Sequence, residues 1–210
     1  DDMGLRAFKS ECPHEVHDVE GALWKREWLP DSRVDTVPSL VRTVVAIDPA
    51  VTSGHDADAT GIIAAALGAD GHVYVIADRS IQGVSPDAWA QRAVALYDEV
   101  AGDRIVAEVN NGGDLVERVL RAVDPLVAYR KVSAQVGKRL RAEPVSALYE
   151  QGKVHHVGHG LTELEEQMCG WTPESGQSPD RLDALVWAVT DLVLGKPSGR
   201  RMPVSAGAMA

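Results

Sequence analysis

The stretch "VVAIDPAV", residues 44–51, places one carboxylate, that of Asp48, directly after four apolar residues. β-Branched residues followed by a proline are typical of a buried strand that ends where the proline removes a backbone donor. A charge at that point has to be hydrated, paired with another charge or bound to a metal ion. The alternative is that Asp48 only begins a turn, where aspartate is common.

A second acid ends a second apolar run in "IVAEVNNGG", residues 105–113, where Glu108 follows Ile105–Ala107. An unpaired carboxylate in an apolar strand is costly, so Glu108 is expected to have either a ligand or a structural ion-pair partner. The glycines that follow would allow the backbone to turn sharply and approach a ligand, although an ordinary loop has the same composition.

A third segment, "SPDRLDALVWAV" at 178–189, carries Asp180 and Asp183 three residues apart, on one face of a predicted helix. Ser178 is its expected N-cap and Pro179 its first residue, and the helix dipole alone would favour acids there. If the strands that end at Asp48 and Glu108 are neighbours, this helix could bring its acids over both. Asp58 in "GHDADATG" is expected to be a loop residue instead.

Four carboxylates in one place would raise one another's pKa unless a cation neutralised them. Oxygen ligands suit Mg²⁺ or Mn²⁺, and His155, His156 and His159 match no metal-binding spacing. These histidines are expected at the surface or at a strand edge. Two such ions, about 3.5–4 Å apart, could activate a water and stabilise the leaving oxygen of a phosphodiester.

Hydrophobic periodicity predicts an α/β fold. Three strands at 41–48, 59–70 and 72–82 would form an antiparallel meander. Further strands are then expected to alternate with helices, which implies a mixed sheet with helices on its faces. The expected strands are 104–110, 126–134 and 154–158, and the expected helices are 85–102, 113–123, 141–153, 161–171 and 178–195.

The whole chain, 210 residues of which 45% are hydrophobic, is consistent with one domain. It contains no apolar run of membrane-spanning length and no signal peptide, so a soluble, non-secreted protein is expected. Cys12 and Cys169 form no zinc or disulfide pattern, which fits a reducing cytosol. Phosphate-loop, dinucleotide-binding and nucleophile-elbow motifs are absent, which disfavours the enzymes built on them.

The net charge of −10 argues against a general nucleic-acid-binding surface. One segment, 130–141, is nevertheless basic and contains no acid. It could contact phosphates without reading sequence, or it could be a solvated helix face. Its cationic residues are Arg130, Lys131, Lys138, Arg139 and Arg141.

Both ends of the chain differ from the centre. Residues 1–39 contain three prolines together with Trp24 and Trp28, which lie one helical turn apart and predict a short helix or docking segment. Residues 196–210 are rich in Pro, Gly, Ser and Ala and are expected to form a flexible tail.

Several of these motifs occur in a familiar order: "VVAIDPA", "ADATGI", "IVAEVNNGGDLV", "KRLRAEPVSALYEQGKVHHV" and "SPDRLDALVWAV". Over residues 40–195 the chain resembles the C-terminal nuclease domain of a tailed-bacteriophage terminase large subunit. The resemblance implies a ribonuclease H-like fold. It also implies that Asp48, Glu108, Asp180 and Asp183 are catalytic and hold two Mg²⁺ or Mn²⁺ ions. Many members have a doubled aspartate where this chain has Pro179-Asp180, and Asp180 is favoured as the direct helix ligand.

The resemblance further implies an endonuclease that cuts double-stranded viral DNA during genome packaging. Residues 1–39 would connect to an N-terminal ATPase motor domain, 40–195 would be the nuclease domain, and Lys131, Lys138, Arg139 and Arg141 would face the DNA. The small terminase subunit and the portal are the implied partners, and the host cytoplasm, transiently at the procapsid portal, is the implied location.

Other functions remain open on sequence alone. A Holliday-junction resolvase or a transposase-like nuclease would have the same fold. A third alternative is a non-catalytic module that binds DNA or docks onto the motor. An actin-like sugar kinase or ATPase also opens with an acid after a strand, but the chain shows no phosphate-cradling loop.

Overall fold

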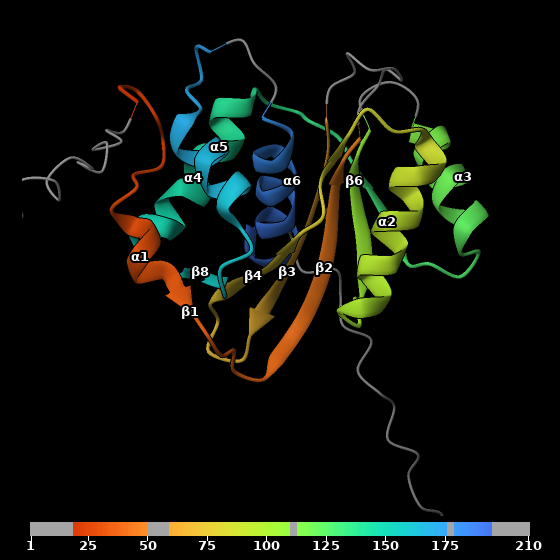
Figure 1. Ribbon diagram of the computed structural model, residues 1–210, viewed down its shortest axis with the longest axis horizontal. Helices are drawn as coiled ribbons and strands as arrows, with labels where there is room; N and C mark the ends of the chain where they lie inside the picture. Colours follow the sequence, from red (N-terminus) through yellow and green to blue (C-terminus); the bar gives the residue numbers. More distant parts are fainter. Residues whose placement is uncertain (1–18, 50–58, 110–112, 176–178, 195–210) are drawn as a thin grey trace, which may run out of the picture.

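The computed structural model describes residues 19–49, 59–109, 113–175 and 179–194, which form a mixed sheet between two layers of helices (Figure 1). Several features considered above lie outside these ranges, namely Cys12, Asp58, the "NNG" segment 110–112, Ser178 and residues 196–210. Within the ranges, no helix is both long enough and apolar enough to cross a membrane.

The predicted antiparallel meander is confirmed. β2 pairs with β3 and β3 with β4, both in antiparallel register. A short strand, β5, pairs with the first two residues of β3. Gly71 has a positive φ of +83° in the turn between β3 and β4, which explains the glycine there. The elements are β2 (Leu40–Asp48), β3 (Ala59–Gly68), β4 (Val73–Asp78) and β5 (Ile81–Gln82).

The remaining strands are parallel to their neighbours, and the sheet order is β1-β8-β4-β3-β2-β6-β7. β6 lies directly beside β2, so the strands that end at Asp48 and Glu108 are neighbours, as the predicted site requires. The predicted mixed sheet, with antiparallel strands followed by parallel ones, is therefore confirmed. These strands are β1 (Arg33–Val34), β6 (Arg104–Glu108), β7 (Tyr129–Val132) and β8 (Val154–Val157).

The two faces of the sheet carry different helices (Figure 1). Val45 and Ile47 of β2 pack in the core beneath α2 (Pro86–Glu99) and α3 (Gly113–Val123). Val44 and Ala46 point the other way, into the core formed with α4 (Lys138–Glu150), α5 (Thr162–Gly170) and α6 (Asp180–Val189). Because side chains alternate along a strand, Asp48 faces the same layer as Val44 and Ala46.

Several element boundaries differ from the predicted ones, and the strand predicted at 72–82 is divided into β4 and β5. The last helix is not one continuous α-helix: α6 begins at Asp180, with Pro179 in the N-cap position, and a π-helical turn, Thr190–Leu194, follows it. Asp191 in this turn is buried and accepts hydrogen bonds from Arg104 and Arg130. The helix predicted from residue 141 begins earlier, at Lys138, and the strand predicted at 126–134 is limited to β7.

The segment before β2 packs against the sheet domain. Trp24 is fully buried and contacts Tyr149 of α4 edge-to-face, with ring centroids 6.2 Å apart. The Ser146 hydroxyl donates to the Leu23 carbonyl at 2.6 Å. The helix α1 (Trp28–Ser32) starts only at Trp28, so Trp24 does not share it, and the other predicted alternative, a docking segment, describes Trp24.

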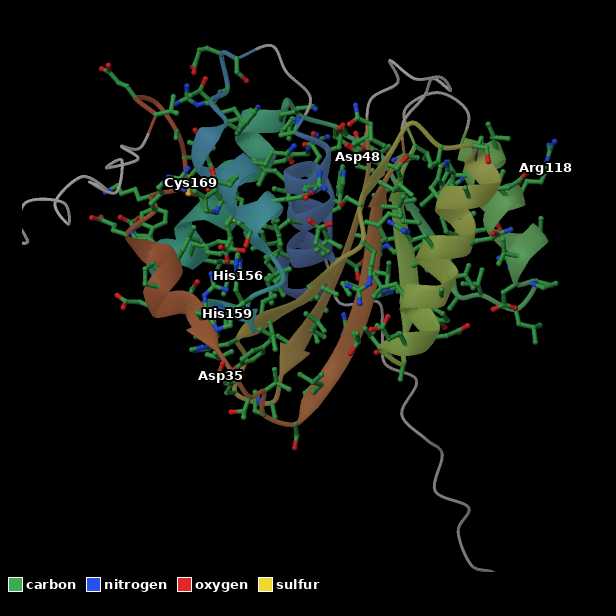
Figure 2. All side chains as sticks on the ribbon, in the orientation of Figure 1. Asp35, Asp48, Arg118, His156, His159 and Cys169 are labelled. Carbon is green, nitrogen blue, oxygen red and sulfur yellow. The ribbon has the colours of Figure 1, made fainter. Side chains whose placement is uncertain are left out.

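The expectation that His156 lies at the surface or at a strand edge is also wrong, since its side chain is fully buried (Figure 2). One ring nitrogen, Nδ1, is 2.8 Å from Glu165 Oε1, and the other, Nε2, is 2.8 Å from the Tyr149 hydroxyl. Arg33 of β1 donates to the same Glu165 carboxylate at 2.7 and 2.9 Å. This network ties the N-terminal segment to β8, α4 and α5.

The network yields a stability prediction. Glu165→Gln should lower the free energy of unfolding at pH 7 by about 2–3 kcal/mol, because a buried charge-assisted network loses its acceptor charge. Hydrogen bonding from His156, together with Arg33, holds the pKa of Glu165 below its usual value. A lowered pKa stabilises the fold above about pH 4.5, and this contribution is lost as the pH falls through the folded-state pKa. Urea unfolding at pH 7 and at pH 4 measures both effects.

Glu166→Gln is the matched control. Glu166 also pairs with the N-terminal segment, through Arg26 at 2.9 Å, but its side chain is 60% exposed. Exposed pairs contribute at most about 1 kcal/mol, so this variant should change stability little. Equal losses of unfolding free energy in the two variants would contradict the conclusion that the buried Glu165 network holds the N-terminal segment on the domain.

Candidate active site

Asp48 and Glu108 end two adjacent parallel strands. Ile47 pairs with Ala107, so the next residue of each strand lies at the same edge of the sheet. By alternation along each strand, both carboxylates belong to the face covered by α6. Figure 2 shows Asp48 at the end of β2, beside the beginning of α6. Glu108 is buried there, with 6% of its surface exposed.

Gly61 in β3 allows α6 to approach these strand ends. It pairs with Asp48 across the sheet, and a Cβ atom placed on it would lie only 1.9 Å from the carbonyl oxygen of Asp180. The first turn of α6 therefore rests on bare β3 backbone next to Asp48. This close approach of α6 to Gly61 was not predicted, although a glycine inside a strand often marks a place where another backbone comes near.

The carboxylates of this cluster interact electrostatically. Burial raises the pKa of Asp48 well above its usual value, and the charges of Asp183 and Glu108, then of Asp180, raise it further. Burial also raises the pKa of Asp183, although Lys138 opposes the rise. Asp180 and Asp183 are both buried. The structure thus brings the four predicted site residues together.

Two cations from the first turn of α4 enter the cluster. Lys138 Nζ lies 2.5 Å from Asp183 Oδ2. Arg141 lies between two acids, with Nη1 3.2 Å from Glu108 Oε1 and Nη2 3.6 Å from Asp183 Oδ1. These side chains supply part of the positive charge that a cluster of four carboxylates requires.

The other two predicted DNA-contacting residues lie away from the acids. Arg139 is exposed and pairs with Glu143 at 2.8 Å and with Glu174 at 3.6 Å. Lys131 is exposed on β7, which forms one edge of the sheet. The basic segment is therefore divided, with Lys138 and Arg141 turned into the cluster and Lys131 and Arg139 turned to solvent.

Trp187 of α6 completes the surroundings of Glu108. Its indole Nε1 donates to Glu108 Oε2 at 2.7 Å, and its ring lies 4.8 Å from the Arg141 guanidinium carbon. Trp187 was not among the residues predicted for the site. The available signal was its position four residues after Asp183, one helical turn along the same face.

The donor set fits a hard divalent cation. Its candidate ligands are carboxylate oxygens, which such ions prefer, and the pKa of Asp48 is raised by burial and by the charges of the neighbouring acids. In the described ranges no three His, Cys, Asp or Glu side chains are already arranged as a metal-binding group. Lys138 and Arg141 contact oxygens of two candidate ligands, Asp183 and Glu108.

A sequence model of the terminase RNaseH-like domain family matches residues 45–192, a range that includes all four carboxylates. The chain belongs to this family. The resemblance inferred from the motif order is therefore confirmed. No curated protein matches the chain.

Solved terminase nucleases share the fold. The large terminase nuclease from thermophilic phage G20c aligns with a TM-score of 0.59 and 13% identity, over 82% of this chain and 99% of that one. The human cytomegalovirus terminase nuclease domain gives 0.60 and 16%, over 79% and 93%. The nuclease domain of gp2 from bacterial virus Sf6 gives 0.58 and 15%, over 79% and 96%. The ribonuclease H-like fold predicted for this terminase domain is thus confirmed.

Proposed function

We propose that this terminase domain is a divalent-metal-dependent endonuclease that cuts double-stranded viral DNA during genome packaging. The observation that supports it is the meeting of Asp48, Glu108, Asp180 and Asp183 at one edge of the sheet, where burial and the charges of the other three acids raise the pKa of Asp48. Four acids in one place, three of them buried, repel one another, and a site that maintains such repulsion is suited to bind cations.

Asp48, Glu108 and the two α6 acids would hold one or two Mg²⁺ or Mn²⁺ ions. When bound, such ions polarise a phosphodiester and lower the pKa of a water nucleophile. The fold relative from phage G20c has been solved with bound magnesium and with bound cobalt, and the Sf6 domain with manganese. Those findings concern the relatives, and they support a divalent cation here.

Asp183 is our preferred principal ligand on α6, although the motif comparison favoured Asp180. Asp183 raises the pKa of Asp48 more than Asp180 does, and Arg141 links it to Glu108. Asp180 would act as the second helix ligand, positioned by its backbone contact with Gly61.

Asp48 would also couple metal binding to protons. Burial and the charges of the neighbouring acids raise its pKa, which favours the neutral carboxyl. Ligation requires the carboxylate, so cation binding should release a proton from this residue.

Lys131, Lys138, Arg139 and Arg141 are the proposed phosphate contacts, which would position a duplex without reading its sequence. The N-terminal ATPase motor domain, the small terminase subunit and the portal are the proposed partners, with action in the host cytoplasm and transiently at the procapsid portal. Residues 1–39 would form the connection to the motor.

Cleavage of supercoiled and linear duplex by this chain tests the proposal, with Mg²⁺, Mn²⁺ or EDTA. Cutting is expected with either metal and not with EDTA, and it should vary little with DNA sequence. Glu108→Gln purified in parallel controls for contaminating nuclease and should be inactive.

Two results would contradict the proposal. A strong preference for a four-way junction over linear duplex would indicate a resolvase. Metal-independent DNA binding without cutting under any of these conditions would indicate a docking module instead.

A further inference from the structure

We propose that Trp187 is a positioning residue that holds the Glu108 carboxylate in the orientation in which it binds a divalent cation. The proposal rests on the proposed metal-dependent nuclease function and assigns a further residue to the same site.

The Trp187–Glu108 hydrogen bond is short and buried. The distance from indole Nε1 to Oε2 is 2.7 Å, and the two residues are 7% and 6% exposed. A buried indole N–H is stabilised by an acceptor, and Glu108 is the acceptor that Trp187 uses. The bond therefore restricts the rotation of the carboxylate about its last side-chain torsion.

The two oxygens of Glu108 have chemically different donors. Arg141 donates to Oε1 and carries a positive charge, so it competes with any cation for the negative charge of this acid. Trp187 donates to Oε2 and is neutral, so it leaves that charge available. A carboxylate oxygen has two lone pairs, and Oε2 can accept the indole N–H while it also ligates an ion.

Helix geometry connects this contact to the other acids. Trp187 and Asp183 lie one turn apart on α6, so a single helix carries one proposed ligand and the group that orients another. Hydrogen-bond partners of metal-binding carboxylates typically change metal affinity about 10–100-fold when they are removed.

The competing explanation is that Trp187 only packs and stacks. Its ring contacts the Arg141 guanidinium at 4.8 Å and contributes to the core beneath α6. Trp187→Phe separates the two roles, because phenylalanine retains an aromatic face for Arg141 and most of the volume but has no N–H.

Two measurements on Trp187→Phe test the proposal. Calorimetric titration with Mn²⁺ without DNA should show affinity reduced about 10–100-fold. The Mn²⁺ concentration for half-maximal cleavage should rise by the same factor, while the rate at saturating Mn²⁺ approaches that of wild type. Trp89→Phe is the matched control, since Trp89 is a buried tryptophan on α2, against the opposite face of the sheet. It should bind Mn²⁺ as wild type does.

Wild-type Mn²⁺ affinity in Trp187→Phe would overturn the proposal, and so would equal losses in both tryptophan variants. If Trp187→Phe does not fold, 3-benzothienylalanine at position 187, which replaces only the N–H by sulfur, must show the reduced affinity. If wild type itself neither binds Mn²⁺ nor cuts DNA, the proposed nuclease function is wrong and this inference falls with it. If wild type binds Mn²⁺ and Trp187→Phe binds it equally well, only the role of Trp187 is refuted and the proposed nuclease function stands.

Discussion

Asp48→Asn is expected to abolish DNA cleavage and, in the absence of metal, to make the domain more stable than wild type. Asparagine has nearly the same shape as aspartate but carries no charge. The substitution removes a ligand from the proposed metal site and, in the same step, removes a carboxylate that is buried among Asp183, Glu108 and Asp180. Activity and stability should therefore change in opposite directions.

The expected loss of rate is at least ~10³-fold, which corresponds to about 4 kcal/mol of the activation barrier. It is measured as plasmid cleavage under saturating Mg²⁺ or Mn²⁺. The stability change is measured as the melting temperature in EDTA at pH 7, where the variant should melt higher. Asp98→Asn, which neutralises an exposed acid on α2, should change neither quantity.

The same substitution should alter the pH dependence of folding. An aspartate whose folded-state pKa is raised contributes stability that is complete below its unfolded pKa of about 3.9 and is lost as the pH rises through the folded value. Metal-free wild type should therefore lose stability from Asp48 as the pH increases above 4, and Asp48→Asn should lack this component. Wild-type cleavage by the variant would exclude Asp48 from the catalytic site.

Gly61→Ala is expected to destabilise the domain by about 3 kcal/mol, the upper part of the usual range for overpacking, and to reduce cleavage strongly. The added methyl group would lie 1.9 Å from the Asp180 carbonyl oxygen and 2.6 Å from its carbonyl carbon. These are backbone atoms at the start of α6, so relief requires the whole helix to shift. Such a shift would carry Asp180, Asp183 and Trp187 away from Asp48 and Glu108.

Chemical denaturation and cleavage assays on Gly61→Ala measure the two effects. Gly170→Ala is the matched control, because a methyl group on Gly170, the last residue of α5, meets no atom within 4 Å. It should leave both stability and cleavage close to wild type. A stable, active Gly61→Ala domain would show that α6 does not depend on close contact with β3.

Much of the site could be predicted because its determinants are local. Asp48 and Glu108 each end an apolar run, and alternation along a strand is sufficient to assign them to one face once their strands are neighbours. The three-residue spacing of Asp180 and Asp183 likewise follows from helix geometry. The order of the motifs then supplied the family.

The unpredicted features depend on contacts between distant segments. Lys138 and Arg141 point toward the acids because α4 lies against α6. No periodicity in the basic segment indicates this arrangement of the two helices. Burial of His156 depends on Glu165, Tyr149 and Arg33, which come from three other elements. The π-helical turn after α6 coincides with buried Asp191 and its two arginine partners, which belong to β6 and β7.

The distribution of the acids along the chain determines when the proposed metal site is completed during synthesis. Asp48 is on the first long strand, whereas Asp180 and Asp183 are on the last α-helix of the described fold. The sheet up to β8 can be translated while half of the acid cluster is still missing. A chain truncated before α6 would therefore contain every strand of the described sheet but lack half of the proposed metal ligands and the α6 part of the core, so the proposed cleavage activity should require the complete domain.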